Sequence, residues 1–376
     1  MNGIEKLDAA FLKEGSRELP VVICYEGIYI RDHVKQLTSL PWWYAHETDI
    51  EKQIDWHGGI AKNIGQDWFA IPGFYSRDER KYLKIKTRSD GVYRVNTKTC
   101  EEFKLREPII GGENYSGLDT AKGPKNEEEA EAMFRGGFDG ETEDIIESGR
   151  ADLARELING ACSGLSPVRS VSTPLYNCVY HWGFSNFMVT IVDNPGLLTY
   201  VCDIIIEKIE RGISDIKKMG AEIIWIEECF LDMINPEMYK KYNLPYVRRI
   251  TDAIRGAGMK SVYYHCGDPK GKMDLILDAG ADAVSFEESK KGFEIEIEKI
   301  VEYVDGRCAV FGNLDAINFL PRCTESELRG EIERFVRAGR KNKSRFVMSI
   351  GSPVTPGTTA EKVRLYCETA REIGSR

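Results

Sequence analysis

The second half of the chain contains a series of short apolar segments that alternate with stretches of helical periodicity. Each segment is rich in β-branched and aromatic residues, as strands are. Strands that alternate with helices form parallel sheets, because a parallel connection needs a long crossover. Right-handed crossovers leave two arrangements, an open doubly wound sheet and a closed barrel. The apolar segments are 222–227, 261–265, 283–287, 308–312 and 346–350.

The glycine motifs that mark nucleotide-binding α/β folds are missing from this sequence. Neither Gly-x-Gly-x-x-Gly after a strand nor Gly-x-x-x-x-Gly-Lys-Ser/Thr occurs. This favours the barrel, and the first half adds two candidate strands at 21–26 and 168–174. We therefore predict an α/β protein in which residues 1–376 form a single (β/α)8 TIM-type barrel domain.

Two insertions are expected in the N-terminal half. Polar and apolar residues alternate on both sides of the turn signal Ser89-Asp90-Gly91, which predicts an inserted β-hairpin at about 83–105. A charged stretch at about 124–160 predicts a helical insertion that leads back into the barrel.

Composition excludes several classes of partner and compartment. The net charge of −9 argues against nucleic acid, which needs a basic surface. No apolar run is long enough to cross a membrane, and the N-terminus has no leader pattern, so we expect a cytoplasmic protein without a membrane partner. The ten cysteines include no Cys-x-x-Cys, which fits reduced thiols.

Polar groups follow the predicted strands at the ends where barrel enzymes carry their catalytic residues. Any one of them is as often a helix cap, a solvated carboxylate or a core residue. Their occurrence after five successive strands favours a common site. The groups are Glu227-Glu228-Cys229, His265-Cys266-Gly267-Asp268, Glu287-Glu288, Gly312-Asn313-Leu314-Asp315 and Gly351-Ser352-Pro353.

An ordered set of motifs between residues 221 and 370 resembles the uroporphyrinogen decarboxylase superfamily, which contains true decarboxylases and cobamide-dependent methyltransferases. The resemblance implies a barrel enzyme, although it does not select one reaction. The motifs are Asn235-Pro236-Glu237-Met238-Tyr239, Leu244-Pro245-Tyr246, His265-Cys266-Gly267, Gly280-Ala281-Asp282-Ala283 with Glu287, and Gly312-Asn313-Leu314-Asp315.

The chain departs from the decarboxylases near its N-terminus. Their arginine-rich segment corresponds to residues 20–29, where Tyr25 and Tyr29 stand in place of the arginines. A porphyrinogen with up to eight carboxylates needs such cations, so tetrapyrrole decarboxylation is not expected. The chain thus resembles the methyltransferase branch more closely. We expect Tyr25, Tyr29, Asn313 and Ser352 to bind substrate.

The methyltransferase branch also implies a metal. Its zinc lies on a His-x-Cys pair, and related methionine synthases add a carboxylate from the next strand. Cys266 matches the thiolate and Glu287 the carboxylate, while Tyr264 takes the place of the histidine and His265 that of the spacer. We expect Cys266 and Glu287, helped by His265, to hold a divalent metal, most simply zinc. A corrinoid would be carried by a separate partner protein.

Two enzymatic hypotheses follow. In the first, the protein moves a methyl group between a small substrate, such as a methoxylated aromatic compound, and the corrinoid protein. Its catalytic groups are Tyr264, His265, Glu227 and Asp67. In the second, a decarboxylase or other lyase acts on a small acid through Asp67 and His265. A barrel retained only as a binding protein is a third, non-enzymatic reading.

Overall fold

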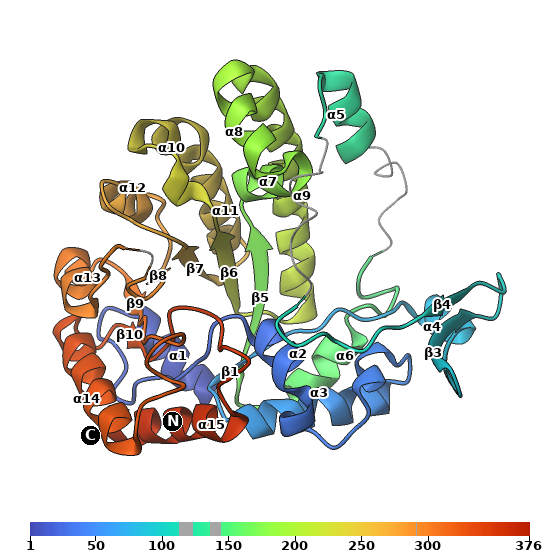
Figure 1. Ribbon diagram of the computed structural model, residues 1–376, viewed down its shortest axis with the longest axis horizontal. Coiled ribbons are helices and arrows are strands. Elements are labelled where there is room, and N and C mark those ends of the chain that lie inside the picture. The colour runs from blue at the N-terminus through green and yellow to red at the C-terminus, as the bar shows by residue number, and fades with distance from the viewer. Residues whose placement is uncertain (113–122, 136–143, 291) are drawn as a thin grey trace.

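A seven-stranded parallel sheet forms the centre of the computed structural model, which describes residues 1–112, 123–135, 144–290 and 292–376. The sheet is curled, and helices cover its outer face (Figure 1). Its α/β class and its parallel strands confirm the sequence prediction at that level. In sheet order the strands are β1 (Trp68–Ala70), β5 (Ser166–Ser172), β6 (Ile223–Glu228), β7 (Lys260–His265), β8 (Ala283–Phe286), β9 (Ala309–Phe311) and β10 (Phe346–Val347).

An extended segment at residues 20–22 lies between the two edges of this sheet. The Val22 amide donates to the Met348 carbonyl and the Asp67 amide donates to the Val21 carbonyl, both at 2.8 Å. The segment forms one isolated parallel bridge, Val21 with Met348, and no strand of its own. The chain then turns at Tyr25, whose φ is 53°, into α2 (Glu26–Leu37). The described residues therefore hold seven strands in this sheet, and the predicted eighth is not confirmed.

The helices follow the strands in sequence and pack outside them. Helix α14 shows why they form: Thr324 and Glu327 make a capping box at its start, and its apolar stripe is buried. The helices outside the insertions are α1 (Gly3–Phe11), α2, η1 (Trp42–His46), α3 (Ile50–Ile64), α7 (Pro174–Trp182), α8 (Phe184–Asp193), α9 (Pro195–Met219), η3 (Leu231–Met233), α10 (Pro236–Tyr242), α11 (Leu244–Gly256), α12 (Met273–Asp278), α13 (Ile297–Val304), α14 (Glu325–Lys341) and α15 (Ala360–Gly374).

The region of the predicted hairpin forms a separate antiparallel sheet. Strands β2 (Leu83–Arg88) and β3 (Gly91–Asn96) pair around the expected turn, and β4 (Glu102–Lys104) adds a third strand. The sheet stands to one side of the central strands (Figure 1). Helix α4 (Arg77–Tyr82) comes before this sheet in the chain. The predicted helical insertion contributes α5 (Glu127–Phe134) and α6 (Asp152–Asn159), and its residues 136–143 lie outside the described residues.

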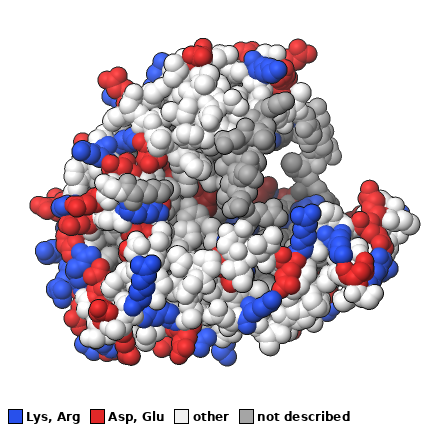
Figure 2. Space-filling model, in the orientation of Figure 1, with Lys and Arg blue, Asp and Glu red and all other residues white. Residues whose placement is uncertain are grey.

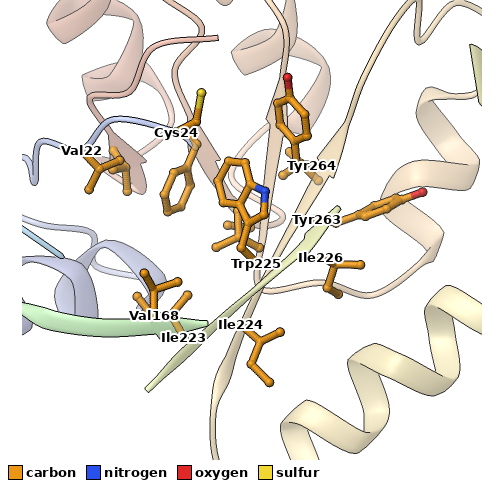
Figure 3. Close-up of a cluster of buried hydrophobic side chains, with 14 of the residues drawn as sticks. Val22, Cys24, Val168, Ile223, Ile224, Trp225, Ile226, Tyr263 and Tyr264 are labelled. Carbon is orange, nitrogen blue, oxygen red and sulfur yellow. The ribbon is translucent and has the colours of Figure 1, made fainter. Parts of the chain in front are cut away.

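Alternation along β6 and β7 decides which side chains face the interior. Trp225 and Tyr264 lie on the inner face and stack, with ring centroids 5.1 Å apart. Ile226 and Tyr263 point the other way, toward the helices (Figure 3). Because side chains alternate between the two faces, the directions of Trp225 and Tyr264 also determine those of the functional residues that follow on both strands.

No single described helix is both long and apolar enough to cross a membrane. Helices α8 and α9 meet the length and composition criteria only as a pair, across a bend of 114°.

Candidate active site

A cavity of about 520 Å³ opens at the C-terminal ends of β1, β5 and β6. Figure 2 shows this face of the molecule hollowed, with acidic side chains visible inside the hollow. Its volume suits a molecule of one or two rings. The lining residues come from three strands, the start of α2 and α7; they are Tyr25, Glu26, Gly27, Ile28, Trp68, Ala70, Ile71, Val168, Arg169, Ser170, Tyr176, Tyr180, Trp225 and Glu227.

Aromatic rings form much of the cavity wall. Trp68 meets the Trp225 ring edge-on at 5.8 Å, and Tyr25 meets Trp225 edge-on at 6.4 Å. Tyr25 also packs edge-on against Tyr264, with ring centroids 5.5 Å apart, so Tyr264 supports Tyr25 in the cavity wall. The positive φ of Tyr25 is costly for a residue with a side chain, and such strain is typical of functional sites. A planar apolar ligand would complement this wall.

Two protonatable carboxyl groups line the same cavity. Burial raises the pKa of Glu227, and a weak hydrogen bond from the Ser172 hydroxyl at 3.4 Å acts in the opposite direction. Burial also raises the pKa of Glu26 to about 7, although the Ala70 amide and the Gln66 side chain donate to it at 3.1 and 2.7 Å. Both groups therefore keep a proton at higher pH than an exposed glutamate does. Glu26 is a potential proton donor that the sequence analysis did not select.

Two thiols meet at the mouth, beside the cavity. Because Glu228 pairs with His265 across β6 and β7, the next residues, Cys229 and Cys266, stand at the same level. A hydrogen bond from Cys266 lowers the pKa of Cys229, and the Tyr25 hydroxyl, 3.7 Å from the Cys229 sulfur, acts in the same direction. Cys266 itself matches the prediction that it lies at the mouth, whereas Cys229 was not predicted as a site residue.

Glu287 and Ser352 are tied together by Lys290. The Lys290 ammonium forms an ion pair with Glu287 and donates to the Ser352 hydroxyl at 2.7 Å. The other Glu287 oxygen accepts a hydrogen bond from the Gly267 amide at 2.8 Å. Gly267 has a φ of 96° and no room for a Cβ, because one would meet Asp232 at 2.3 Å.

Asn313 is a support residue in this structure. Its side-chain amide donates to the carbonyls of Glu287 and Ile295, both at 2.9 Å, which fixes the backbone that carries Glu287. Asn313 and Ser352 are both buried and neither lines the cavity.

Residues 168–373, more than half of the chain, match the family model of uroporphyrinogen decarboxylase (URO-D). The chain belongs to this family. Uroporphyrinogen decarboxylase from Xanthomonas euvesicatoria pv. vesicatoria (strain 85-10) is 22% identical over 188 residues, 48% of this chain and 51% of that protein. The enzyme from Prochlorococcus marinus (strain MIT 9215) is 21% identical over 181 residues, 48% and 49% of the two chains. The chain thus matches only about half the length of these curated relatives.

A structural comparison covers almost the whole chain. A methyltransferase from Methanosarcina mazei superposes with a TM-score of 0.67 at 18% identity, over 99% of both chains. This likeness establishes the shared fold. The resemblance to the superfamily inferred from the motifs is confirmed.

His265 is wrongly placed in the predicted catalytic and metal-binding sets. Tyr264 faces the interior, so the next residue on the strand faces the helices. There the His265 ring is fully buried and meets Tyr239 edge-on at 6.0 Å. Burial lowers the pKa of His265 to about 3, which keeps the imidazole neutral.

The predicted metal ligands consequently do not form a site. His265 points away from Cys266, and the Glu287 carboxylate is already paired with Lys290. Within the described ranges, no three His, Cys, Asp or Glu side chains come together as ligands for a metal ion. These three residues therefore do not fit zinc in the predicted arrangement.

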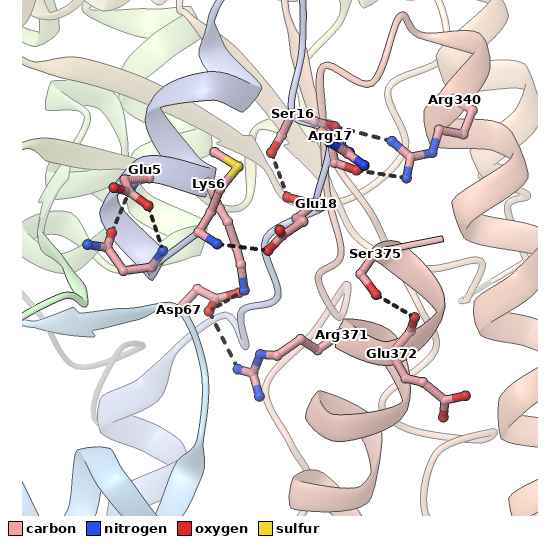
Figure 4. Close-up of polar contacts among 12 residues, drawn as sticks. Glu5, Lys6, Ser16, Arg17, Glu18, Asp67, Arg340, Arg371, Glu372 and Ser375 are labelled. Atoms are coloured by element: carbon pink, nitrogen blue, oxygen red, sulfur yellow. Dashed lines mark hydrogen bonds and ion pairs between the residues drawn. The ribbon is translucent and has the colours of Figure 1, made fainter.

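Two further predicted residues lie away from the cavity. Asp67 precedes β1, at the opposite end of the sheet, where its carboxylate pairs with Lys6 at 3.3 Å and Arg371 at 3.5 Å (Figure 4). Tyr29 is buried against His33, with ring centroids 4.6 Å apart, and does not line the cavity. Of the two tyrosines expected at the positions of the family's arginines, only Tyr25 lines the cavity.

Proposed function

We propose that the protein transfers a methyl group between a small planar substrate in the cavity and a separate corrinoid protein. One observation carries the proposal: a half-buried carboxyl group with a raised pKa, Glu227, lines a cavity whose walls are aromatic. A methyl ether needs a proton on its leaving oxygen when the methyl group departs. The wall would bind the ring, and Glu227 would supply that proton.

The residues at the mouth would orient the substrate. Tyr25 is fixed by its contacts with Trp225 and Tyr264, and the Tyr264 hydroxyl donates to the Gly351 carbonyl at 2.9 Å. This chain of contacts keeps the Tyr25 ring rigid over the cavity. A corrinoid carried by the partner would supply the nucleophile that accepts the methyl group. The protein's own contribution is positioning, exclusion of water and proton donation.

The lyase alternative loses its supporting residues. It relied on Asp67 and His265, and neither lines the cavity. Decarboxylation of a tetrapyrrole is also poorly supported, because Arg169 is the one Lys or Arg among the described residues that line the cavity. Several carboxylates would need several cations.

The test uses purified protein, para-methoxybenzoate as substrate and chemically reduced cob(I)alamin as the methyl acceptor. We expect release of the phenol and formation of methylcobalamin, measured by chromatography and absorbance. Glu227→Gln should lower the rate by about 100-fold, since general acids contribute roughly 10²–10⁴-fold. An exposed matched control, Glu302→Gln, should behave as wild type. Release of carbon dioxide without methylcobalamin would refute methyl transfer and revive the lyase.

A further inference from the structure

Arg169 is a cation in the cavity wall, and no carboxylate of the described residues forms an ion pair with it. It lies in β5 between Val168 and Ser170, and all three residues line the cavity. One guanidinium N–H donates to the Ile71 carbonyl at 2.5 Å, which anchors the side chain where β1 ends. Across the described ranges, no carboxylate forms an ion pair with Arg169, and this backbone contact is its one hydrogen bond.

The two cavity carboxyl groups are engaged elsewhere. Glu26 accepts from Gln66 and the Ala70 amide, and Glu227 accepts from Ser172. Arg169 is only partly exposed, and burial lowers its pKa without a compensating acidic neighbour. A guanidinium has five N–H donors, so several remain for a ligand. Leaving a partly desolvated charge unpaired is unfavourable unless a bound anion pairs with it.

We propose that Arg169 binds a carboxylate of the substrate, so that the substrate class is small planar aromatic acids with one anionic group. This inference rests on the proposed function for the choice of the cavity, and it deepens that proposal by naming the class of substrate. One cation matches one carboxylate, and the planar fork of the guanidinium can bind it through two hydrogen bonds. The aromatic wall would hold the ring, and Glu227 would lie at the end that needs a proton.

The experiment measures binding alone, by titration calorimetry at neutral pH without any methyl acceptor. The ligands are para-methoxybenzoate and its neutral isostere para-methoxybenzamide. Wild-type protein should prefer the benzoate by about 10- to 100-fold, the range of a charge-assisted contact. Arg169→Met should bind both ligands about equally, because only the benzoate loses a partner. Arg169→Lys should keep an intermediate preference.

The control variant is Arg337→Met, an exposed arginine in α14, which should keep the wild-type preference. Thermal melts show whether Arg169→Met is misfolded. If it is, the inference is tested by whether Arg169→Lys prefers the benzoate over the benzamide less strongly than wild type does. Equal affinities in wild type, failure of the benzoate to bind at millimolar concentration, or an unchanged preference in the Arg169 variants would each overturn the inference. An Arg169-dependent preference without demethylation would refute the proposed function alone.

Discussion

The Lys290 ammonium forms an ion pair with Glu287, three residues earlier in the chain, and both side chains are largely buried. The pair occupies the carboxylate that the sequence suggested as a metal ligand. The second oxygen of Glu287 is engaged by the Gly267 amide, so little of its coordinating capacity remains. Lys290 therefore does what a divalent cation would do: it balances the charge of a carboxylate beyond the C-terminal end of β8.

Removing the lysine should create zinc affinity. In Lys290→Met, Glu287 loses its counter-charge and stands near the Cys266 and Cys229 thiols, which are good zinc ligands. We expect zinc to bind at least about tenfold more tightly than in wild type, measured by competition with a chromophoric chelator. Adding Cys266→Ser should reverse the gain, and Lys299→Met, which breaks an exposed ion pair, should have no effect. Stoichiometric, Cys266-dependent zinc in the wild type would contradict this account.

The rate of demethylation should depend on pH through Glu227. Burial raises the pKa of Glu227, and only its protonated form can donate. The rate is therefore expected to be highest at low pH and to fall as pH rises through this raised pKa. Glu227→Gln should remove that descending limb from the profile of kcat against pH. If the limb persists in the variant, another group supplies the proton, and Glu26 is the first to test by the same substitution.

Glu228 should make stability fall with pH. It is fully buried, and burial raises its pKa to about 7 despite hydrogen bonds from Thr173, Asn243 and Tyr263. The unfolded chain ionises near 4.5, so the folded state binds the extra proton between about pH 4.5 and 7. Its stabilising contribution is complete below about 4.5 and is lost as pH rises through 7.

Glu228→Gln tests this by urea denaturation across that range. The glutamine can keep the same partners, with its oxygen toward Asn243 and its amide toward Thr173. As pH rises from 4 to 8, the free energy of unfolding of the variant should increase by about 3 kcal/mol relative to that of wild type. The figure follows from roughly 1.4 kcal/mol per pKa unit. Exposed Glu237→Gln should show no such trend. A difference between Glu228→Gln and wild type that does not change with pH would show that Glu228 ionises normally.

The strands of the second half could be predicted because their apolar segments are regular and well separated. The polar residues that follow each strand could be predicted for the same reason. The direction of each side chain could not be predicted, since one residue of register reverses it. For this reason the prediction from sequence gives His265 a role at the mouth and gives Cys229 none. A sequence signal did exist within β7: alternation places Tyr264 and Cys266 on one face and His265 on the other. The pairing of Glu227 with Tyr264, which places Glu227 and Cys229 on the same face, is visible only in the structure.

The first half was harder to predict because its elements are short and held by distant contacts. Strand β1 has three residues, and the segment at 20–22 contributes a single bridge. Asp67 shows the difficulty clearly. The sequence predicts it as a catalytic residue, but its partners lie 61 and 304 positions away along the chain. Local patterns contain no information about such pairs.

Asp67 should therefore matter for stability and not for catalysis. Its carboxylate accepts from the Val21 amide at 2.7 Å and pairs with the buried Lys6 ammonium, which joins α1, the segment at 20–22 and β1. Asp67→Asn would leave Lys6 charged and buried without a counter-charge. We expect a loss of about 3 kcal/mol in the free energy of unfolding, in the range for breaking a buried ion pair.

Urea denaturation measures that loss, and the double variant Lys6→Met with Asp67→Asn should recover part of it because the stranded charge is gone. Asp78→Asn, which breaks the exposed pair with Lys81, should cost less than about 1 kcal/mol. The kcat/KM of folded Asp67→Asn should stay within about twofold of wild type, since a residue at the opposite end of the sheet does not contact the substrate. A fall in kcat of about 100-fold with unchanged stability would instead restore Asp67 to the catalytic set.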